Sequence, residues 1–380
     1  GRVHTVLSDN PRDRLLVGSA YGITAINPFE RISSTFELPN GMELFTMMRW
    51  NPSSEDYLIL GTNHGIHSLI LENGLPQMDT LSASNIGPVQ VIEPLQTGSG
   101  DLDLILLGHG SNAWRMTISE SSSGTGNPDF SEVIAIEELT QMLDIVGASF
   151  TEVIHVPMSG RGPMLIVGTD SGMIRWDTTD GTSSIGQPFW IYTTEDAEEY
   201  VQFADLLNQS KSAVVNVMEL AGPVATDGSL EEVTGVWLGT PGGIHLIDLD
   251  LFVGLPKQAF ITDRMFNLER WEEGANDIYS IHAIDGKILL GSRDGTWALE
   301  GGSQGVLGIV ENQTRMPGLV TSLTTFIHDG NQYLFAGVSP GEYMNIMPIN
   351  PKSIDSDLDG MPDGWEFVYG LDPTDPYDRV

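Results

Sequence analysis

The chain has no cysteine and only four lysines among its 380 residues. Without cysteine it has no disulfide framework and no thiolate metal site. No apolar run reaches the roughly 18 residues that a membrane-spanning helix needs, so we expect no direct membrane insertion of this segment. The shortage of basic residues leaves 17 cationic side chains against 52 acidic ones and a formal net charge of −35. Such a charge disfavours nucleic acid as a partner.

Glycine, by contrast, is abundant, and many of the 43 glycines recur within one phrase. The phrase is an apolar run, a glycine, and a second turn residue four positions later, as in "LILGTNHGIHSL" from Leu58 to Leu69. We call the first glycine of each copy the anchor glycine. The seven anchors are Gly18, Gly61, Gly108, Gly168, Gly239, Gly291 and Gly337. A repeat at this spacing indicates an array of similar structural units.

Each copy of the phrase predicts the same local structure. The three residues before every anchor are apolar, which is typical of a strand buried on both faces. The second glycine, or Asn112 in the third copy, predicts a hairpin turn. With a strand-like run upstream and a weaker one downstream, each copy predicts four antiparallel strands, the plan of a propeller blade. We therefore predict an all-β, seven-bladed β-propeller over residues 1–350.

The seventh copy raises a question of closure. It ends in "YMNIMPI" and a proline, and shows no fourth strand. Because unpaired strand edges recruit other chains, we consider three alternatives: a strand from upstream of Gly1, strand donation by another subunit in self-assembly, or a blade of three strands. The chain begins Gly1-Arg2 in mid-pattern, so we expect it to be part of a longer or processed polypeptide.

The repeat also carries a resemblance. "YSIHAIDGKILLGSRDGTWAL", from Tyr279 to Leu299, resembles the repeat of the two-component-regulator type of propeller. The resemblance covers about residues 1–348. It implies, as the spacing alone does not, an extracytoplasmic sensory or scaffold module and not a catalyst.

The C-terminal stretch "DSDLDGMPDGWE" matches the calcium-loop pattern D-x-D-x-D-G-x5-E. Alternating carboxylates surround a hard cation, Gly360 permits the sharp turn, and a final glutamate can supply two oxygens. The predicted Ca²⁺ ligands are Asp355, Asp357, Asp359, the backbone carbonyl of Met361, Asp363 and Glu366. The alternative is an acidic tail without a metal. "INPKSI" before the loop leaves no room for the entering helix of an EF-hand.

Residues 355–378 resemble instead the aspartate-rich calcium-binding repeats of the thrombospondin type 3 class in bacterial and archaeal surface proteins. The resemblance implies that residues 351–380 form a calcium-stiffened linker. It also implies an extracellular or cell-surface location, where calcium is millimolar.

Other candidates are less specific. His282 and His328 lie on predicted innermost strands, where they could share a metal or be ordinary hydrogen-bonded residues. Six residues after the anchors stand Thr24, His67, Trp114, Ile174, His245, Trp297 and Tyr343, which could face a ligand or pack within the blades. Two insertions, 119–149 and 178–213, could form recognition loops or packed connections. The second contains "FWIYTTEDAEEYVQF", for which we expect a short helix.

No catalytic set emerges from the sequence, which has no Gly-x-Ser-x-Gly, no His-Glu-x-x-His and no phosphate loop. We therefore expect a non-enzymatic interaction or scaffold module, for adhesion or assembly, within a larger secreted or surface protein. Its expected partners are other protein subunits or surface glycans. The alternative is a carbohydrate-binding or carbohydrate-active propeller; an enzyme would need two convergent carboxylates in a central pocket. A sensor domain is a third option.

Overall fold

The computed structural model describes most of residues 3–349. Besides stretches of one to four residues, the ranges outside the description are 96–100, 121–127, 141–148, 157–163, 179–184, 194–213, 222–232, 249–261, 267–276 and 350–380. The predicted calcium ligands between residues 355 and 366 therefore lie outside the described residues.

The described strands form seven antiparallel sheets, taken here in chain order. The first contains β1 (Val3–Asp9), β2 (Arg14–Ser19), β3 (Gly22–Asn27) and β4 (Ile32–Glu37), and the second β5 (Leu44–Trp50), β6 (Tyr57–Thr62), β7 (Gly65–Glu72) and β8 (Leu75–Ser84). The third contains β9 (Val89–Leu95), β10 (Leu102–Gly108), β11 (Ala113–Ser119), β12 (Asp129–Phe130) and β13 (Ile134–Ala135). The fourth contains β14 (Phe150–Val156), β15 (Met164–Thr169), β16 (Gly172–Thr178) and β17 (Ile185–Thr193). The fifth contains β18 (Val217–Ala221), β19 (Gly235–Thr240), β20 (Gly243–Asp248) and β21 (Thr262–Phe266). The sixth contains β22 (Ile278–Ile284), β23 (Lys287–Ser292), β24 (Gly295–Gly302) and β25 (Gly305–Thr314), and the last β26 (Leu319–His328), β27 (Asn331–Ser339) and β28 (Met344–Ile349).

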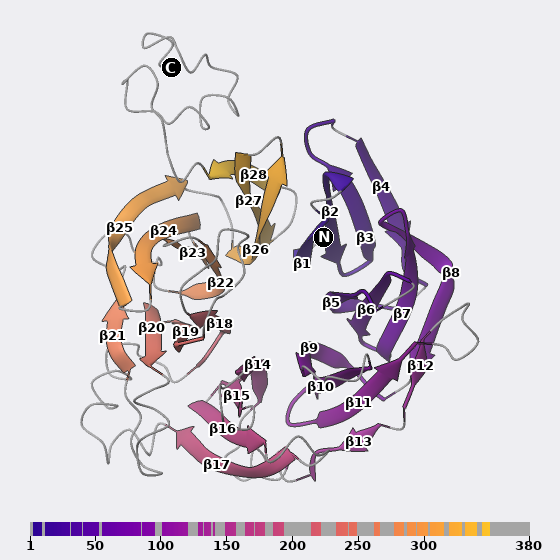
Figure 1. The fold of residues 1–380 in the computed structure, drawn as a ribbon, viewed down its shortest axis with the longest axis horizontal. Coiled ribbons are helices and arrows are strands. Elements are labelled where there is room, and N and C mark those ends of the chain that lie inside the picture. The colour runs from indigo at the N-terminus through magenta and orange to yellow at the C-terminus, as the bar shows by residue number, and fades with distance from the viewer. Residues whose placement is uncertain are drawn as a thin grey trace.

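These sheets are arranged around a central axis, with the first strand of each sheet innermost (Figure 1). The all-β, propeller-like fold predicted from the repeat is thus confirmed, and the described part of the chain has almost no helix. Five sheets have the four-stranded meander expected of a blade, the third sheet has five strands, and the last has three.

The second strand of each sheet forms the core, as the apolar runs before the anchors predicted. Every residue of β6 and of β19 is buried. In β6, Leu58 and Leu60 belong to a cluster with the first sheet, whereas Ile59 belongs to a cluster with the third. The two faces of one strand are therefore covered by the sheets before and after it, which explains the absence of alternating polar residues.

The anchor glycines are the points where consecutive sheets approach most closely. A Cβ atom on Gly61 would lie 2.7 Å from the carbonyl oxygen of Val89, the first residue of β9. Six of the seven anchors would place a Cβ within 2.5 to 2.9 Å of a residue that lies within two positions of the start of the next innermost strand. Gly108 is the exception, because the ring of Trp114 occupies the space beside it. The anchor glycine is therefore required by contact between sheets, whereas the hairpin turn uses the second glycine, such as Gly65 with its positive φ.

The last sheet contacts the first sheet in the same way. A Cβ atom on Gly337 of β27 would lie 2.5 Å from Val3 Cγ1 on β1. Phe29 extends this junction, since its ring stacks on Phe326 at 5.8 Å and meets Tyr333 edge-on at 4.9 Å. The two ends of the described chain are thus joined through a single apolar cluster.

The first insertion adds β12 and β13, which both pair with β11 on the outside of the third sheet. In the second, the aromatic half of "FWIYTTEDAEEYVQF" is not in a loop: Phe189–Thr193 belongs to β17, the outer strand of the fourth sheet. The short helix expected after it lies outside the described residues. No helix in the described part of the chain is long and apolar enough to cross a membrane.

Candidate functional site: an acidic pocket in the channel

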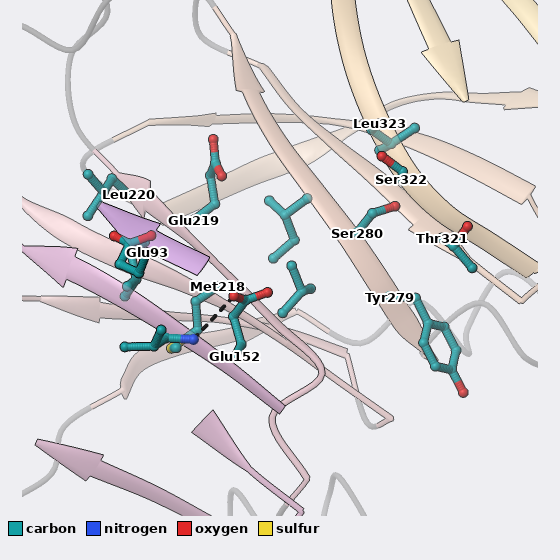
Figure 2. A pocket seen from close by; sticks show the side chains of 14 residues that line it. Glu93, Glu152, Met218, Glu219, Leu220, Tyr279, Ser280, Thr321, Ser322 and Leu323 are labelled. Carbon is teal, nitrogen blue, oxygen red and sulfur yellow. Dashed lines mark hydrogen bonds between the residues drawn. The ribbon is translucent and has the colours of Figure 1, made fainter. Parts of the chain in front are cut away.

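A cavity of about 470 Å³ lies between the innermost strands of the third to seventh sheets (Figure 2). Its lining comes from β9, β14, β18, β22 and β26, which face the central axis in Figure 1. Three glutamates, Glu93, Glu152 and Glu219, come from the first three of these strands. In Figure 2 they stand on one side, and the hydroxyl groups of Ser280, Thr321 and Ser322 stand on the other. None of the 14 described lining residues is a lysine or arginine.

Two of the carboxyl groups accept hydrogen bonds from backbone amides. The N–H of His155 on β14 donates to Glu93 Oε1 at 2.6 Å, so the Glu93 side chain joins the third sheet to the fourth. The N–H of Val153 donates to Glu152 Oε1 at 3.2 Å (Figure 2). Both amides lie on β14, an innermost strand whose inner edge pairs with no other strand among the described residues. The glutamate carboxyl groups therefore accept hydrogen bonds from amides that would otherwise lack an acceptor.

Burial dominates the electrostatics of this pocket. Desolvation raises the pKa of Glu93 to about 8. The hydrogen bond from the His155 amide opposes this rise, and repulsion from Glu152 and Glu219 adds to it. Desolvation likewise raises the pKa of Glu152 to about 7, and the Val153 amide opposes it. These two carboxyl groups, of Glu93 and Glu152, therefore retain protons at a pH at which ordinary glutamates have lost them.

The two histidines of the predicted pair lie on different innermost strands, β22 and β26. His282 lies on β22, and its Nε2 is 3.0 Å from the hydroxyl oxygen of Thr325 on β26. Burial lowers the pKa of His282 to about 4, so its ring is neutral. His328 ends β26, where it pairs with Asn331. The described residues thus give His282 a threonine partner, which supports the structural interpretation.

Three of the described residues six positions after the anchors lie within the blades. Trp297 is buried in a cluster between the fifth and sixth sheets, and Trp114 packs between the second and third. Thr24 instead lies close to Thr35 of β4, with their hydroxyl oxygens 3.2 Å apart. Packing within the blades accounts for these three positions.

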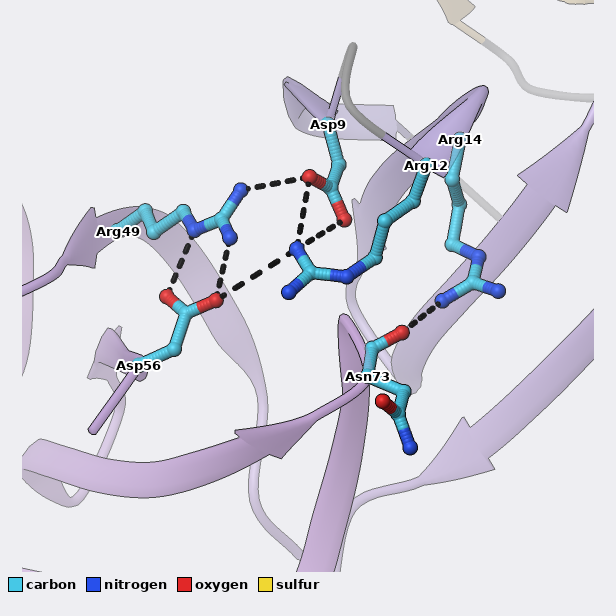
Figure 3. Close-up of polar contacts among 6 residues, drawn as sticks. All are labelled: Asp9, Arg12, Arg14, Arg49, Asp56 and Asn73. Atoms are coloured by element: carbon cyan, nitrogen blue, oxygen red, sulfur yellow. Dashed lines mark hydrogen bonds and ion pairs between the residues drawn. The ribbon is translucent and has the colours of Figure 1, made fainter. Parts of the chain in front are cut away.

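A separate polar cluster joins the first two sheets (Figure 3). Arg49 on β5 contacts Asp56 through two nitrogens and donates to Asp9 Oδ1 at 2.9 Å. Arg12 also binds Asp9, at 3.1 Å. Asp9 is almost fully buried, at 1% side-chain exposure, so these contacts compensate its charge. Within the described residues, no group of three or more His, Asp or Glu side chains is arranged to hold a metal ion.

Sequence reasoning missed the three channel glutamates, because acidic residues are so frequent in this chain. A usable signal was present, since Glu93 and Glu219 each stand four residues after the apolar residue, Val89 or Val215, that faces an anchor glycine. His282 stands four residues after Ile278, in the same relative position. At this position Glu93 and Glu219 line the cavity, and His282 reaches the next sheet through Thr325.

No family model matches the chain, and no curated protein matches it. Solved structures do match its fold. A structure titled as Chaetomium thermophilum Raptor aligns with a TM-score of 0.54 and 11% identity, over 92% of this chain and 28% of that one. A chain of a mitotic checkpoint complex aligns with a TM-score of 0.52 and 12% identity, over 88% and 84%. A chain from a complex of BBS1N with ARL6DN, soaked with lead, aligns with a TM-score of 0.54 and 10% identity, over 93% and 94%. At these identities the likeness shows the fold alone.

Proposed function

We propose that this chain is a non-enzymatic interaction module, a scaffold for adhesion or assembly within a larger extracellular or cell-surface protein. The observation that carries the proposal is that polar side chains on the innermost strands form hydrogen bonds to neighbouring sheets. The Glu93 carboxyl, the Thr321 hydroxyl and the Ser280 hydroxyl are each hydrogen-bonded to the backbone of a neighbouring sheet. They act in holding the ring together, which leaves the outer faces and connecting loops for partners.

The seven sheets are, in this proposal, seven blades of one closed ring. The junction between the last and first sheets has the same glycine contact as five other junctions, which supports counting the three-stranded and five-stranded sheets as blades. The outer edge of β28 has no strand paired to it among the described residues. We propose that a strand from another subunit pairs there, and that self-assembly proceeds through this edge.

The segment 351–380 is, in the same proposal, a calcium-stiffened linker. Asp355, Asp357, Asp359, Met361, Asp363 and Glu366 hold one Ca²⁺, and millimolar extracellular calcium loads the site. The support is the spacing of carboxylates and glycine in the sequence. Surface proteins or surface glycans are the partners that fit a strongly acidic, calcium-dependent module.

Light scattering after size-exclusion chromatography tests assembly. The protein is measured in millimolar calcium and in excess chelator, beside the variant Asp357→Asn/Asp359→Asn. Large assemblies that dissociate in chelator, and that the variant does not form, support the proposal. A monomer in both conditions contradicts assembly through β28.

A second candidate function, a carbohydrate-active propeller, is favoured by one observation: Glu93, Glu152 and Glu219 converge on a central cavity, and a raised pKa suits a general acid. The rest of the lining fits sugar less well, since Tyr279 is the one aromatic residue among the described lining residues and seven others are Val, Ile, Leu or Met. Hydrolysis of a glycan panel, lost in both Glu152→Gln and Glu219→Gln but not in the surface variant Glu72→Gln, would replace the scaffold proposal with an enzymatic one.

A further inference from the structure

We propose that Glu93 and Glu152, beside Glu219, form a proton-dependent part of the channel wall: neutral carboxyl groups let the third and fourth sheets pack together there, and ionised ones repel each other. The three residues belong to the innermost strands of three consecutive sheets and line one cavity. This inference goes beyond the scaffold function and does not depend on it.

The hydrogen bond from His155 places the Glu93 carboxyl group at the junction between the third and fourth sheets. Glu93 Oε1 accepts the N–H of the next sheet at 2.6 Å, and a neutral carboxyl group accepts this bond through its carbonyl oxygen. The neutral group leaves no net charge beside the other two glutamates. Ionisation would place up to three negative charges around one cavity whose described lining contains no cation.

The neighbouring strands offer little compensation. The other charged or titratable residues on the strands packed against β9, β14 and β18 are Arg49, Tyr57, Asp103, His155, Tyr279 and His282. Arg49 is bound to Asp9 and Asp56, and Asp103 is bound to Arg115. Burial lowers the pKa values of His155 and His282, so neither supplies a cation, and burial raises the pKa of Tyr279, which stays neutral.

The direction of the effect follows from proton linkage. The pKa of Glu93 rises from 4.5 to about 8 and that of Glu152 from 4.5 to about 7 in the native protein. Between these values the native state holds protons that the unfolded chain has released. Stability is therefore full below about pH 4.5 for these two groups and falls as pH rises through 7 and 8.

Thermal unfolding of the wild type and of Glu93→Gln at about pH 5 and about pH 9 tests the inference, because glutamine mimics the protonated side chain. We expect equal unfolding midpoints at the lower pH and a midpoint on the order of 5 °C higher for the variant at the upper pH. Glu72→Gln, which removes an exposed charge on β7, controls for the general repulsion in a chain of net charge −35 and should follow the wild type.

Infrared spectroscopy at pH 7 supplies a second readout. We expect a carbonyl band from a protonated carboxyl group in the wild type, diminished in Glu93→Gln. A constant difference between variant and wild type at both pH values, or no such band in the wild type, overturns the inference. If Glu93→Gln does not fold, Glu152→Gln provides the same comparison, with its transition nearer pH 7.

Discussion

The hydroxyl group of Thr321 donates a 2.7 Å hydrogen bond to the carbonyl oxygen of Val3, a residue 318 positions earlier in the chain. Equivalent bonds run from Ser280 to the carbonyl of Val320 at 3.3 Å and from Asn216 to that of Ile278 at 2.8 Å. The junction between the last and first sheets is therefore built like the junctions within the chain. Closure needs no special device, only the same residue types at the same place.

The first prediction concerns this junction. Gly337→Ala places a methyl group 2.5 Å from Val3 Cγ1 and should lower the free energy of unfolding by about 1–3 kcal/mol through overpacking. Urea unfolding measures the loss. In the double variant Gly337→Ala/Val3→Ala the clash is relieved, so its loss should be smaller than the sum of the two single losses; simple additivity would contradict the contact.

The second prediction separates two arginines of the cluster in Figure 3. Arg49→Met should destabilise the protein by about 3 kcal/mol, because Asp9 and Asp56 both lose a partner and Asp9 is almost fully buried. Arg12→Met should cost less than about 1 kcal/mol, since the Arg12 side chain is 37% exposed and Arg49 still holds Asp9. Chemical denaturation compares them, and equal losses would show that the cluster is not organised around Arg49.

The third prediction concerns His282. Its pKa of about 4, against an ordinary 6.5, means that the unfolded chain gains a proton before the native ring does as the pH falls. His282 therefore stabilises the fold above about pH 6.5 and loses that contribution as the pH falls towards 4. Ring signals in NMR spectra, assigned with His282→Gln, should stay those of a neutral imidazole at about pH 5. Thr325→Val serves as the control that removes the hydroxyl partner, and a titration midpoint near 6.5 would refute the assignment.

The fourth prediction concerns the acidic segment. Calorimetric titration should detect one Ca²⁺ bound with a dissociation constant of ~10⁻⁴–10⁻³ M. Asp357→Asn/Asp359→Asn should abolish the heat of binding, because two of the carboxylates around the cation are lost. Asp101→Asn, an exposed carboxylate in the described part of the ring, should leave it unchanged. Binding that survives in the double variant would place the calcium elsewhere.

The strands could be predicted from sequence because their signals are local. Leu58, Ile59 and Leu60 precede Gly61, and the same pattern of three apolar residues before a glycine returns in each sheet. The close approach of Gly337 to Val3 also follows from a ring, because the seventh anchor glycine then faces the start of the first sheet.

Glu152 could not be placed in the pocket in this way, because side-chain direction on its strand depends on an irregularity. The register of β14 shifts between Phe150 and Glu152, and that of β22 between Ile278 and Ser280. An extra residue at this point disturbs the alternation on which assignment of faces relies. Glu152 was consequently one acidic residue among 52 until the backbone was placed.

The junction between the last and first sheets also sets a delay during synthesis. Val3, Val6 and Phe29 are translated early, yet their apolar partners Phe326 and Phe335 follow roughly 300 residues later. At ribosomal rates of 5–20 residues per second, this flank of the first sheet stays uncovered for about 15–60 s. The nascent chain is therefore expected to need a chaperone on that flank, and truncated products that stop before the last sheet should aggregate through it.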